Sequence, residues 1–288
     1  MKNKIYKKIS EFTSIGVGGE CRGIFLPETT EEFIKIMQDF DKQSIPYKVI
    51  GNGTNLLFSD EFQDYFVIST RKIAKKMSKR NNYVTFSSSV NLFDAYNFCL
   101  KNNLSGFEKL ASIPGNIGGA IASGSSCYGV SIFDNLKNIS IYHNGEVRIV
   151  SIKQLKKSYH SSCFLENTFI KPKIILSAKF ELQVNNPCTI QKTYLNYISK
   201  RILTQPYGRS FGCVFKNING LSAGKLLDEC GLKGLQKNDA FISDKHANFI
   251  INKSKASFND IYFLIQTMEN KIKEKYNITL EKDVEIIK

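Results

Sequence analysis

The chain has 288 residues, which is too long for one small core and suits two or three packed units. Hydrophobic residues make up 42% and charged residues 23%, a composition that excludes a disordered chain. The net charge is +14, but the lysines are dispersed, which favours a solvated surface or an anionic small ligand over a nucleic-acid interface.

The cysteines and the N-terminus indicate the compartment. There are seven cysteines, an odd number with no Cys-x-x-Cys pair, so neither a disulfide framework nor a metal site is indicated. The basic N-terminus is not followed by the apolar segment of a signal peptide, and no apolar run approaches a membrane span in length. We therefore expect a soluble, cytoplasmic protein with reduced thiols and no membrane partner.

Strand and helix patterns alternate along the chain, which predicts an α+β fold. Thr29 and Glu32 have the spacing of a capping box, in which the two side chains satisfy backbone amides reciprocally at the start of a helix. A strand is predicted over residues 47–50, another over 83–88 and a helix over 92–101. The apolar residues at helical spacing after the first cap are Phe33, Ile36, Met37 and Phe40.

The next predicted element is a hairpin, because an Asn-Gly pair at 144–145 lies between β-branched runs at 139–142 and 147–150. A further strand is predicted over 174–182, and a domain boundary is expected near 200–208.

Two capped helices and a strand are predicted in the C-terminal third. Ser222 is placed to cap a helix that Gly231 ends, and residues 248–252 have the pattern of a buried strand. Ser257 and Asp260 cap the last helix. Its core face is predicted to carry Ile261, Leu264, Ile265, Met268 and Ile272.

Two glycine-rich stretches are candidates for binding phosphate groups. Residues 51–55 (Gly-Asn-Gly-Thr-Asn) follow a predicted strand directly, and residues 113–120 read Ile-Pro-Gly-Asn-Ile-Gly-Gly-Ala. The first lacks both the Rossmann pattern and the Gly-Lys-Ser/Thr of a P-loop. Either stretch alone also fits a tight turn, but glycines let a backbone approach a ligand closely, and two such loops favour one phosphate-rich cofactor.

Two further stretches carry reactive side chains. Residues 212–217 (Gly-Cys-Val-Phe-Lys-Asn) place a thiol near Lys216, which favours chemistry because a cation stabilises a thiolate, although a buried inert cysteine also fits. His246 precedes an apolar strand, where a hydrogen-bonded structural histidine is the alternative to a functional one.

Taken in order, these stretches resemble the flavin-dependent UDP-N-acetylenolpyruvoylglucosamine reductases. Residues 13–19, 51–57, 113–120, 212–217, 223–228 and 245–252 match the family's motifs, so the resemblance covers almost the whole chain. The compact, hairpin-linked layout resembles the family's shorter subtype, which lacks an extra loop that closes over the substrate.

The resemblance implies a fold in three parts. It predicts a two-part FAD-binding unit of the vanillyl-alcohol-oxidase type over residues 1–78 and 79–203. An α+β substrate-binding domain is predicted over 204–288, with a C-terminal strand that returns to the active site. A monomer is expected.

The resemblance also implies the reaction. FAD is bound non-covalently, NADPH reduces it, and the reduced flavin passes hydride to the enolpyruvyl group of a UDP-sugar to form UDP-N-acetylmuramate, a peptidoglycan precursor. Hydride addition builds an enolate, which a cationic donor stabilises by about 3–4 kcal/mol. A positioned acid then protonates the neighbouring carbon, a contribution of about 10²–10⁴-fold.

The family's functional residues map onto this sequence position by position. The implied catalytic residues are Cys213, His160 and Asp283, and the implied substrate-binding residues are Tyr159, Lys216, Asn217 and His246. The implied cofactor-binding residues are Gly51, Asn52, Gly53, Thr54, Asn55, Leu56, Ile113, Pro114, Gly115, Asn116, Gly118, Gly119, Gly124 and Tyr128.

All three implied catalytic positions depart from the family pattern. Cys213 matches the proton-donating serine, and a thiol, with an unperturbed pKa near ~8.5, is the stronger acid. His160 matches an arginine but offers no bidentate fork, so Arg201 or Arg209 is a candidate substitute. Asp283 matches a glutamate but is one methylene shorter, and a misplacement of about 1 Å can cost roughly 10²-fold in rate, so Glu281 or Glu285 is a candidate substitute.

Two alternatives follow. The departures are also compatible with a flavin-binding homologue that has lost activity or changed its substrate. The net charge alone would suit a nucleic-acid-binding protein, whose affinity would fall steeply with salt.

Overall fold

The computed structural model describes residues 4–155, 157–158, 161–164, 169–218 and 220–288, which form two units. Unit 1 takes the described residues up to Tyr6, together with Arg22–Asn52 and Asp64–Arg201. Unit 2 takes Lys7–Cys21, Gly53–Gln63 and Ile202–Lys288. The chain therefore crosses between the units inside the first glycine-rich stretch, between Asn52 and Gly53. The three ranges expected from the family resemblance stay a prediction.

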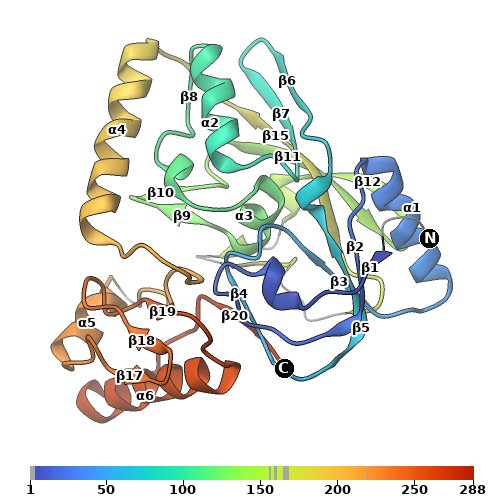
Figure 1. The fold of residues 1–288 in the computed structure, drawn as a ribbon. Coiled ribbons are helices and arrows are strands. Elements are labelled where there is room, and N and C mark those ends of the chain that lie inside the picture. The colour runs from blue at the N-terminus through green and yellow to red at the C-terminus, as the bar shows by residue number, and fades with distance from the viewer. Residues whose placement is uncertain (1–3, 156, 159–160, 165–168, 219) are drawn as a thin grey trace. The chain divides into compact units, whose positions relative to one another are not determined.

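The first sheet of unit 1 has the strand order β1-β2-β5-β3, with α1 in the same core (Figure 1). Thr29 caps α1 by accepting a hydrogen bond from the Glu32 N–H. The predicted reciprocal half of the capping box is wrong, because the Glu32 carboxylate accepts from the Glu28 N–H instead, at 2.9 Å. The bounds are β1 Lys4–Ile5, β2 Cys21–Phe25, α1 Thr30–Lys42, β3 Tyr47–Ile50 and β5 Gln63–Ser69.

The second sheet of unit 1 is antiparallel, in the order β12-β11-β15-β7-β6. The predicted hairpin is confirmed: His143 pairs with Glu146, and both Asn144 and Gly145 have the positive φ of a type I′ turn. The bounds are β6 Met77–Arg80, β7 Tyr83–Ser87, β11 Leu136–His143, β12 Glu146–Ser151 and β15 Ile174–Glu181.

Three helices accompany this sheet in unit 1. Helix α2 (Leu92–Lys101) has the predicted bounds, and α3 (Ile117–Ser123) begins inside the second glycine-rich stretch. Helix α4 (Pro187–Thr204) lies beside α2, where the rings of Tyr194 and Tyr96 stack with centroids 4.5 Å apart (Figure 1).

Short elements complete unit 1. They are η2 Thr70–Lys72, η3 Leu110–Ser112, η4 Ile152–Gln154, β8 Leu104–Ser105, β9 Ser126–Cys127, β10 Val130–Ser131, β13 Lys157–Ser158, β14 Ser161–Ser162 and β16 Gln183–Val184.

Unit 2 packs two helices and two small sheets around one core. Ser222 and Ser257 cap α5 and α6 as predicted, and the predicted apolar face of α6 is buried. The predicted strand 248–252 is shorter than expected and begins at Ile250. Asn248 instead hydrogen-bonds the segment that contains Phe215, as described below. The bounds are η1 Ile9–Phe12, β4 Leu56–Phe58, α5 Ala223–Glu229, β17 Gln236–Lys237, β18 Ala240–Ile242, β19 Ile250–Asn252, α6 Phe258–Tyr276 and β20 Glu285–Ile287.

Within the described part of the chain, no helix combines the length and the apolarity that a membrane span requires.

Candidate active site

In unit 1 the two glycine-rich stretches contact each other through Asn116. The Asn116 side chain accepts a hydrogen bond from the Gly119 N–H at 2.9 Å and donates one to Thr70 at 3.3 Å. A Cβ at Gly51 would lie only 2.7 Å from the Asn116 Oδ1. Gly51 is therefore a glycine because a neighbouring side chain occupies the space of its Cβ. That the two loops bind one phosphate-rich cofactor stays a prediction.

A cation lies beside the same loops. The Arg71 guanidinium donates a hydrogen bond to the Asn52 carbonyl at 2.9 Å, and burial lowers the pKa of Arg71. The Asn52 amide in turn donates to the Asn91 side chain at 3.0 Å. Neither Arg71 nor Asn91 is among the site residues predicted from the sequence. Arg71 lies in a short basic run, and Asn91 follows a predicted strand, which are the only signals that point to them.

The other predicted cofactor residues of unit 1 occupy connections between elements. Gly118 lies against Ser88, so a Cβ there would come within 2.7 Å of the Ser88 Cβ. Gly124 ends α3 in the left-handed conformation. Tyr128 also has a positive φ, and its ring lies 4.7 Å from that of Tyr197. Ile113 follows η3, Pro114 is next in the chain, and the Gly115 carbonyl accepts from the Leu92 N–H at 3.1 Å.

In unit 2 the rest of the first glycine-rich stretch holds the C-terminal segment. A Cβ at Gly53 would lie 2.0 Å from the Phe12 carbonyl oxygen, so only glycine fits there. The Asn55 amide donates to the Asp283 carbonyl at 2.9 Å, and the Glu285 N–H donates to the Asn55 carbonyl at 3.0 Å. The chain runs through Thr54 into β4, which begins at Leu56 and pairs with β20 in parallel. Within this unit the C-terminal strand therefore lies beside the first glycine-rich stretch, and its return to an active site stays a prediction.

Cys213 and Asp283 are on neighbouring segments of unit 2. The Asp283 N–H donates to the Val214 carbonyl at 2.8 Å, one residue after Cys213. On the other side, Cys213 forms a bridge with Phe249, and the Val214 N–H donates to the Asn248 carbonyl at 2.9 Å. The Asn248 side chain also bonds both backbone groups of Phe215. These contacts explain why β19 begins only at Ile250.

Lys216 and Asn217 make contacts that the sequence did not predict. The Lys216 ammonium pairs with the Glu281 carboxylate at 2.5 Å. The Asn217 side chain accepts from the Ala223 N–H at 3.1 Å at the start of α5.

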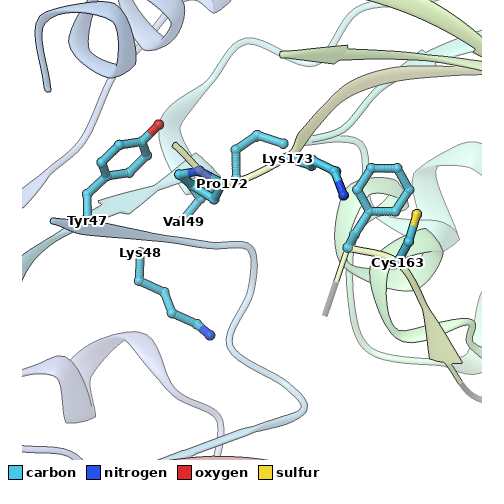
Figure 2. Close-up of a pocket in the computed structure, with 8 residues that line it drawn as sticks. Tyr47, Lys48, Val49, Cys163, Pro172 and Lys173 are labelled. Carbon is cyan, nitrogen blue, oxygen red and sulfur yellow. The ribbon is translucent and has the colours of Figure 1, made fainter. Parts of the chain in front are cut away.

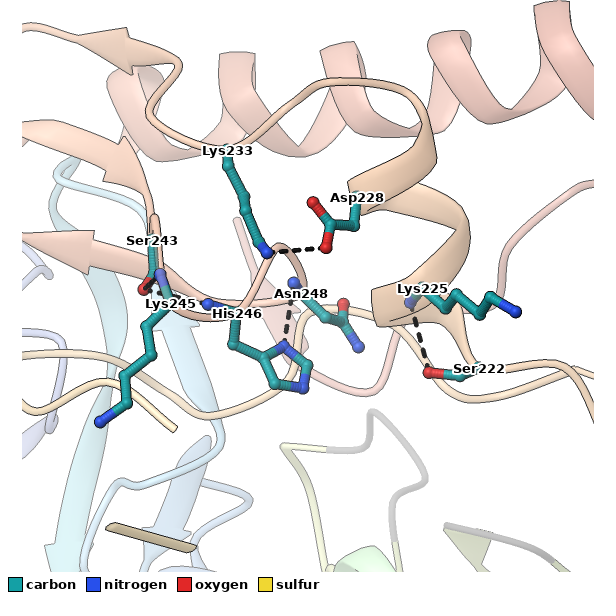
Figure 3. Close-up of polar contacts among 8 residues, drawn as sticks. All are labelled: Ser222, Lys225, Asp228, Lys233, Ser243, Lys245, His246 and Asn248. Atoms are coloured by element: carbon teal, nitrogen blue, oxygen red, sulfur yellow. Dashed lines mark hydrogen bonds and ion pairs between the residues drawn. The ribbon is translucent and has the colours of Figure 1, made fainter. Parts of the chain in front are cut away.

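His246 lies among polar residues near α5 (Figure 3). Its Nδ1 accepts from the Asn248 N–H at 3.2 Å, so the proton of the neutral ring is on Nε2. The ring covers Gly224, whose Cβ would lie 2.7 Å from the His246 Cε1. Burial, followed by the charge of Lys233, lowers the pKa of His246 and keeps the ring neutral. Lys233 itself pairs with Asp228 at 2.6 Å.

Two predicted residues, Tyr159 and His160, lie outside the described residues. Of the arginines considered as substitutes for the family's arginine, Arg201 in unit 1 contacts the Cys127 sulfur at 3.9 Å. Arg209 in unit 2 donates to the Ser254 carbonyl at 3.2 Å, and its side chain passes Gly16.

Unit 1 also contains a small pocket beside β3 (Figure 2). It is lined by Tyr47, Lys48, Val49, Cys163, Phe164, Pro172, Lys173 and Ile174. None of the predicted site residues that the structure describes lines it, and we assign it no role in the reaction.

Two family models match the chain. The model described as FAD binding domain matches residues 21–151, and the one described as UDP-N-acetylenolpyruvoylglucosamine reductase, C-terminal domain, matches residues 205–287. The predicted α+β class, with an FAD-binding part followed by the family's C-terminal domain, is thereby confirmed.

Curated relatives and a solved structure match at full length. The UDP-N-acetylenolpyruvoylglucosamine reductase of Fusobacterium nucleatum is 31% identical, and the alignment covers 100% of each chain. The one of Prochlorococcus marinus is 34% identical, with 100% of this chain and 98% of its own covered. The crystal structure of the Thermus caldophilus reductase superposes with a TM-score of 0.84 at 28% identity, covering 99% of each chain. Because these similarities extend over the whole chain, it belongs to the UDP-N-acetylenolpyruvoylglucosamine reductase family.

Proposed function

We propose that this chain reduces UDP-N-acetylenolpyruvoylglucosamine to UDP-N-acetylmuramate with NADPH and FAD, in peptidoglycan precursor synthesis. Family membership makes it an FAD-dependent oxidoreductase. The observation that carries the proposal for the reacting residues is the hydrogen-bonded pairing of the Cys213 segment with the Asp283 segment in unit 2.

The residues of unit 1 fit a bound FAD. Closely packed glycine backbone at Gly51 and Gly118, with the Arg71 guanidinium on the Asn52 carbonyl, suits a pyrophosphate. Gly51, Asn52 and Asn116 are the residues that would hold it. The chemistry that bound FAD supplies is hydride transfer from NADPH to the methylene carbon of the enolpyruvyl group.

The chain's own residues then complete the reaction. Cys213 donates its thiol proton to the carbon next to the one that receives hydride, which converts the enolpyruvyl double bond into a lactyl ether. Asp283, on the neighbouring segment, is the second proposed catalytic residue, and its N–H donates to the Val214 carbonyl next to Cys213. His246, neutral near pH 7, offers its Nε2–H to the UDP-sugar as a hydrogen-bond donor.

The second candidate is a flavoprotein of the same family with a changed substrate. The thiol at Cys213 and the shortened carboxylate at Asp283 favour it. We also propose that the protein acts as a monomer in the cytoplasm, predictions that rest on the sequence alone.

The deciding experiment is anaerobic. The purified protein is reduced with NADPH, UDP-N-acetylenolpyruvoylglucosamine is added, and the visible flavin band is followed. We expect the band to bleach and then to return as UDP-N-acetylmuramate forms. A band that bleaches and does not return would support the changed substrate. A protein that carries no flavin and does not oxidise NADPH would contradict both.

A further inference from the structure

The segment 213–216 is the middle of three hydrogen-bonded segments in unit 2. On one side it pairs with residues 248–249, through the Cys213–Phe249 bridge and the Asn248 contacts. On the other side it pairs with residues 281–283, through the Asp283 N–H to Val214 and the Phe215–Lys282 bridge. The relative position of Cys213 and Asp283 therefore depends on how the C-terminal segment is registered.

One residue pair fixes this register twice. The Lys216 N–H donates to the Glu281 carbonyl at 2.9 Å, and the Lys216 ammonium pairs with the Glu281 carboxylate at 2.5 Å. A shift of the C-terminal segment by one residue would break both contacts and would also remove the Asp283 N–H from Val214.

The ion pair is unequal in burial, which makes Glu281 the partner on which Lys216 depends. The Lys216 side chain is 9% exposed, whereas that of Glu281 is 73% exposed. A buried ammonium without a counter-charge is strongly disfavoured, while an exposed carboxylate loses little when it is left alone. Substitution of Glu281 should therefore unseat Lys216 without opening a cavity in the core.

The same segment carries a second ion pair that serves as a matched control. Lys282, the next residue, pairs with Glu269 on α6. That side-chain pair ties the C-terminal segment to a helix, whereas Lys282 meets segment 213–216 through its backbone, in the bridge with Phe215. Glu281 and Glu269 each accept from a lysine on one of the two paired segments. Of the two acidic residues, Glu281 pairs with the segment that contains Cys213.

We propose that Glu281 is a positioning residue for the reduction of the UDP-sugar. Its ion pair with Lys216 holds the C-terminal segment in the register that sets Asp283 against Val214, the residue after Cys213. The inference rests on the proposed function, and it assigns the Lys216 ammonium to Glu281 and not to the substrate.

The test separates the two half-reactions in Glu281→Gln, Glu281→Asp and Glu269→Gln, all in the flavin-loaded protein. For Glu281→Gln we expect the rate of flavin re-oxidation at saturating UDP-N-acetylenolpyruvoylglucosamine to fall about 10- to 100-fold, as for a misplacement near 1 Å. Flavin reduction by NADPH and the substrate concentration for half-maximal rate should stay within twofold. Glu281→Asp keeps the charge and should recover part of the rate, and Glu269→Gln should match the unsubstituted protein.

A second readout does not depend on activity. Hydrogen exchange of the peptide that contains Lys282–Ile286 should quicken in Glu281→Gln, because the Asp283 amide loses its fixed acceptor. In Glu269→Gln, exchange in peptide 213–217 should be unchanged.

Three results would overturn the proposal. The first is an unchanged re-oxidation rate in Glu281→Gln, and the second is an equal loss of that rate in Glu269→Gln. The third is a higher substrate concentration for half-maximal rate in Glu281→Gln with an unchanged maximal rate. The last would mean that Lys216 binds substrate directly. Failure of the unsubstituted protein to re-oxidise would instead contradict the proposed function, so the two failures are distinguishable.

Discussion

Cys213 is the residue that we propose as the proton donor of the reaction. Its backbone bridges Phe249, and the next residue bonds Asp283, so its place is set by two neighbouring segments. A side chain held in this way can act as an acid without any help from the Lys216 ammonium, which Glu281 binds.

Replacement of Cys213 tests its role as the acid. We expect Cys213→Ala to slow flavin re-oxidation by the UDP-sugar about 10²–10⁴-fold, the usual contribution of a positioned acid. The re-oxidation rate of Cys213→Ser, which restores the family's residue, should stay within about tenfold of the rate of the unsubstituted protein. Stopped-flow absorbance with each reduced variant gives both rates. Equal rates for Cys213→Ala and the unsubstituted protein would show that another group donates the proton.

His246 couples stability to pH. Its pKa is lowered in the folded protein by burial and then by Lys233, so the unfolded chain binds more protons as pH falls. The stability that the neutral ring provides is present above the unfolded pKa of about 6.5 and is lost as pH falls below it. We expect the free energy of unfolding to drop more between pH 7.5 and 5.5 in the unsubstituted protein than in His246→Gln. Urea titrations at the two pH values measure the difference. An equal drop in the free energy of unfolding of the two proteins would rule the coupling out.

At the scale of elements, glycines in the loops serve packing as much as ligand approach. Gly53 has a φ of +65° and faces the Phe12 carbonyl, whereas Gly231, at +69° after α5, has open space around its Cβ position. The two positions share a backbone conformation and differ in their surroundings.

This difference predicts unequal costs for the same substitution. Gly231→Ala should lower the free energy of unfolding by about 1 kcal/mol, the cost of the left-handed conformation alone. Gly53→Ala adds a contact of 2.0 Å with backbone, which must shift, so its loss should be larger by roughly 2 kcal/mol or more. Chemical denaturation compares the two variants, and similar losses would mean that the loop relaxes freely.

Helix α4 shows where an element escapes a pattern-based prediction. Among its described residues only Ile190 is buried, so no apolar stripe marks the helix in the sequence. Its inner face is aromatic instead, with Tyr194 on Tyr96 and Tyr197 on Tyr128.

For the molecule as a whole, the cofactor should contribute to stability. If unit 1 holds a pyrophosphate, FAD at about 100 times its Kd should add about 2.7 kcal/mol and raise the Tm by roughly 5 °C. Riboflavin, which lacks the pyrophosphate, should give a much smaller shift at the same concentration. Thermal unfolding of flavin-depleted protein with each compound tests this, and equal shifts would show that the riboflavin part of FAD supplies the affinity and the pyrophosphate does not.

The local elements and the family could be predicted from short-range patterns and motifs of the chain. Caps at Ser222 and Ser257, the Asn-Gly turn and the helical spacing in α6 are short-range features, so neighbouring residues suffice to specify them. The ordered glycine-rich and Cys213-containing motifs sufficed for the α+β class and the reductase family.

The contacts between distant site residues could be found in the folded protein but not predicted from the sequence. The Asn55 amide bonds a carbonyl 228 residues away, and Lys216 pairs with Glu281 across 65 residues. The Asn116 side chain occupies the space that a Cβ at Gly51 would need, and the Phe12 carbonyl does the same at Gly53. Such contacts follow from the packing of distant segments, and the spacing of residues along a chain carries no record of which distant partner will occupy a given space.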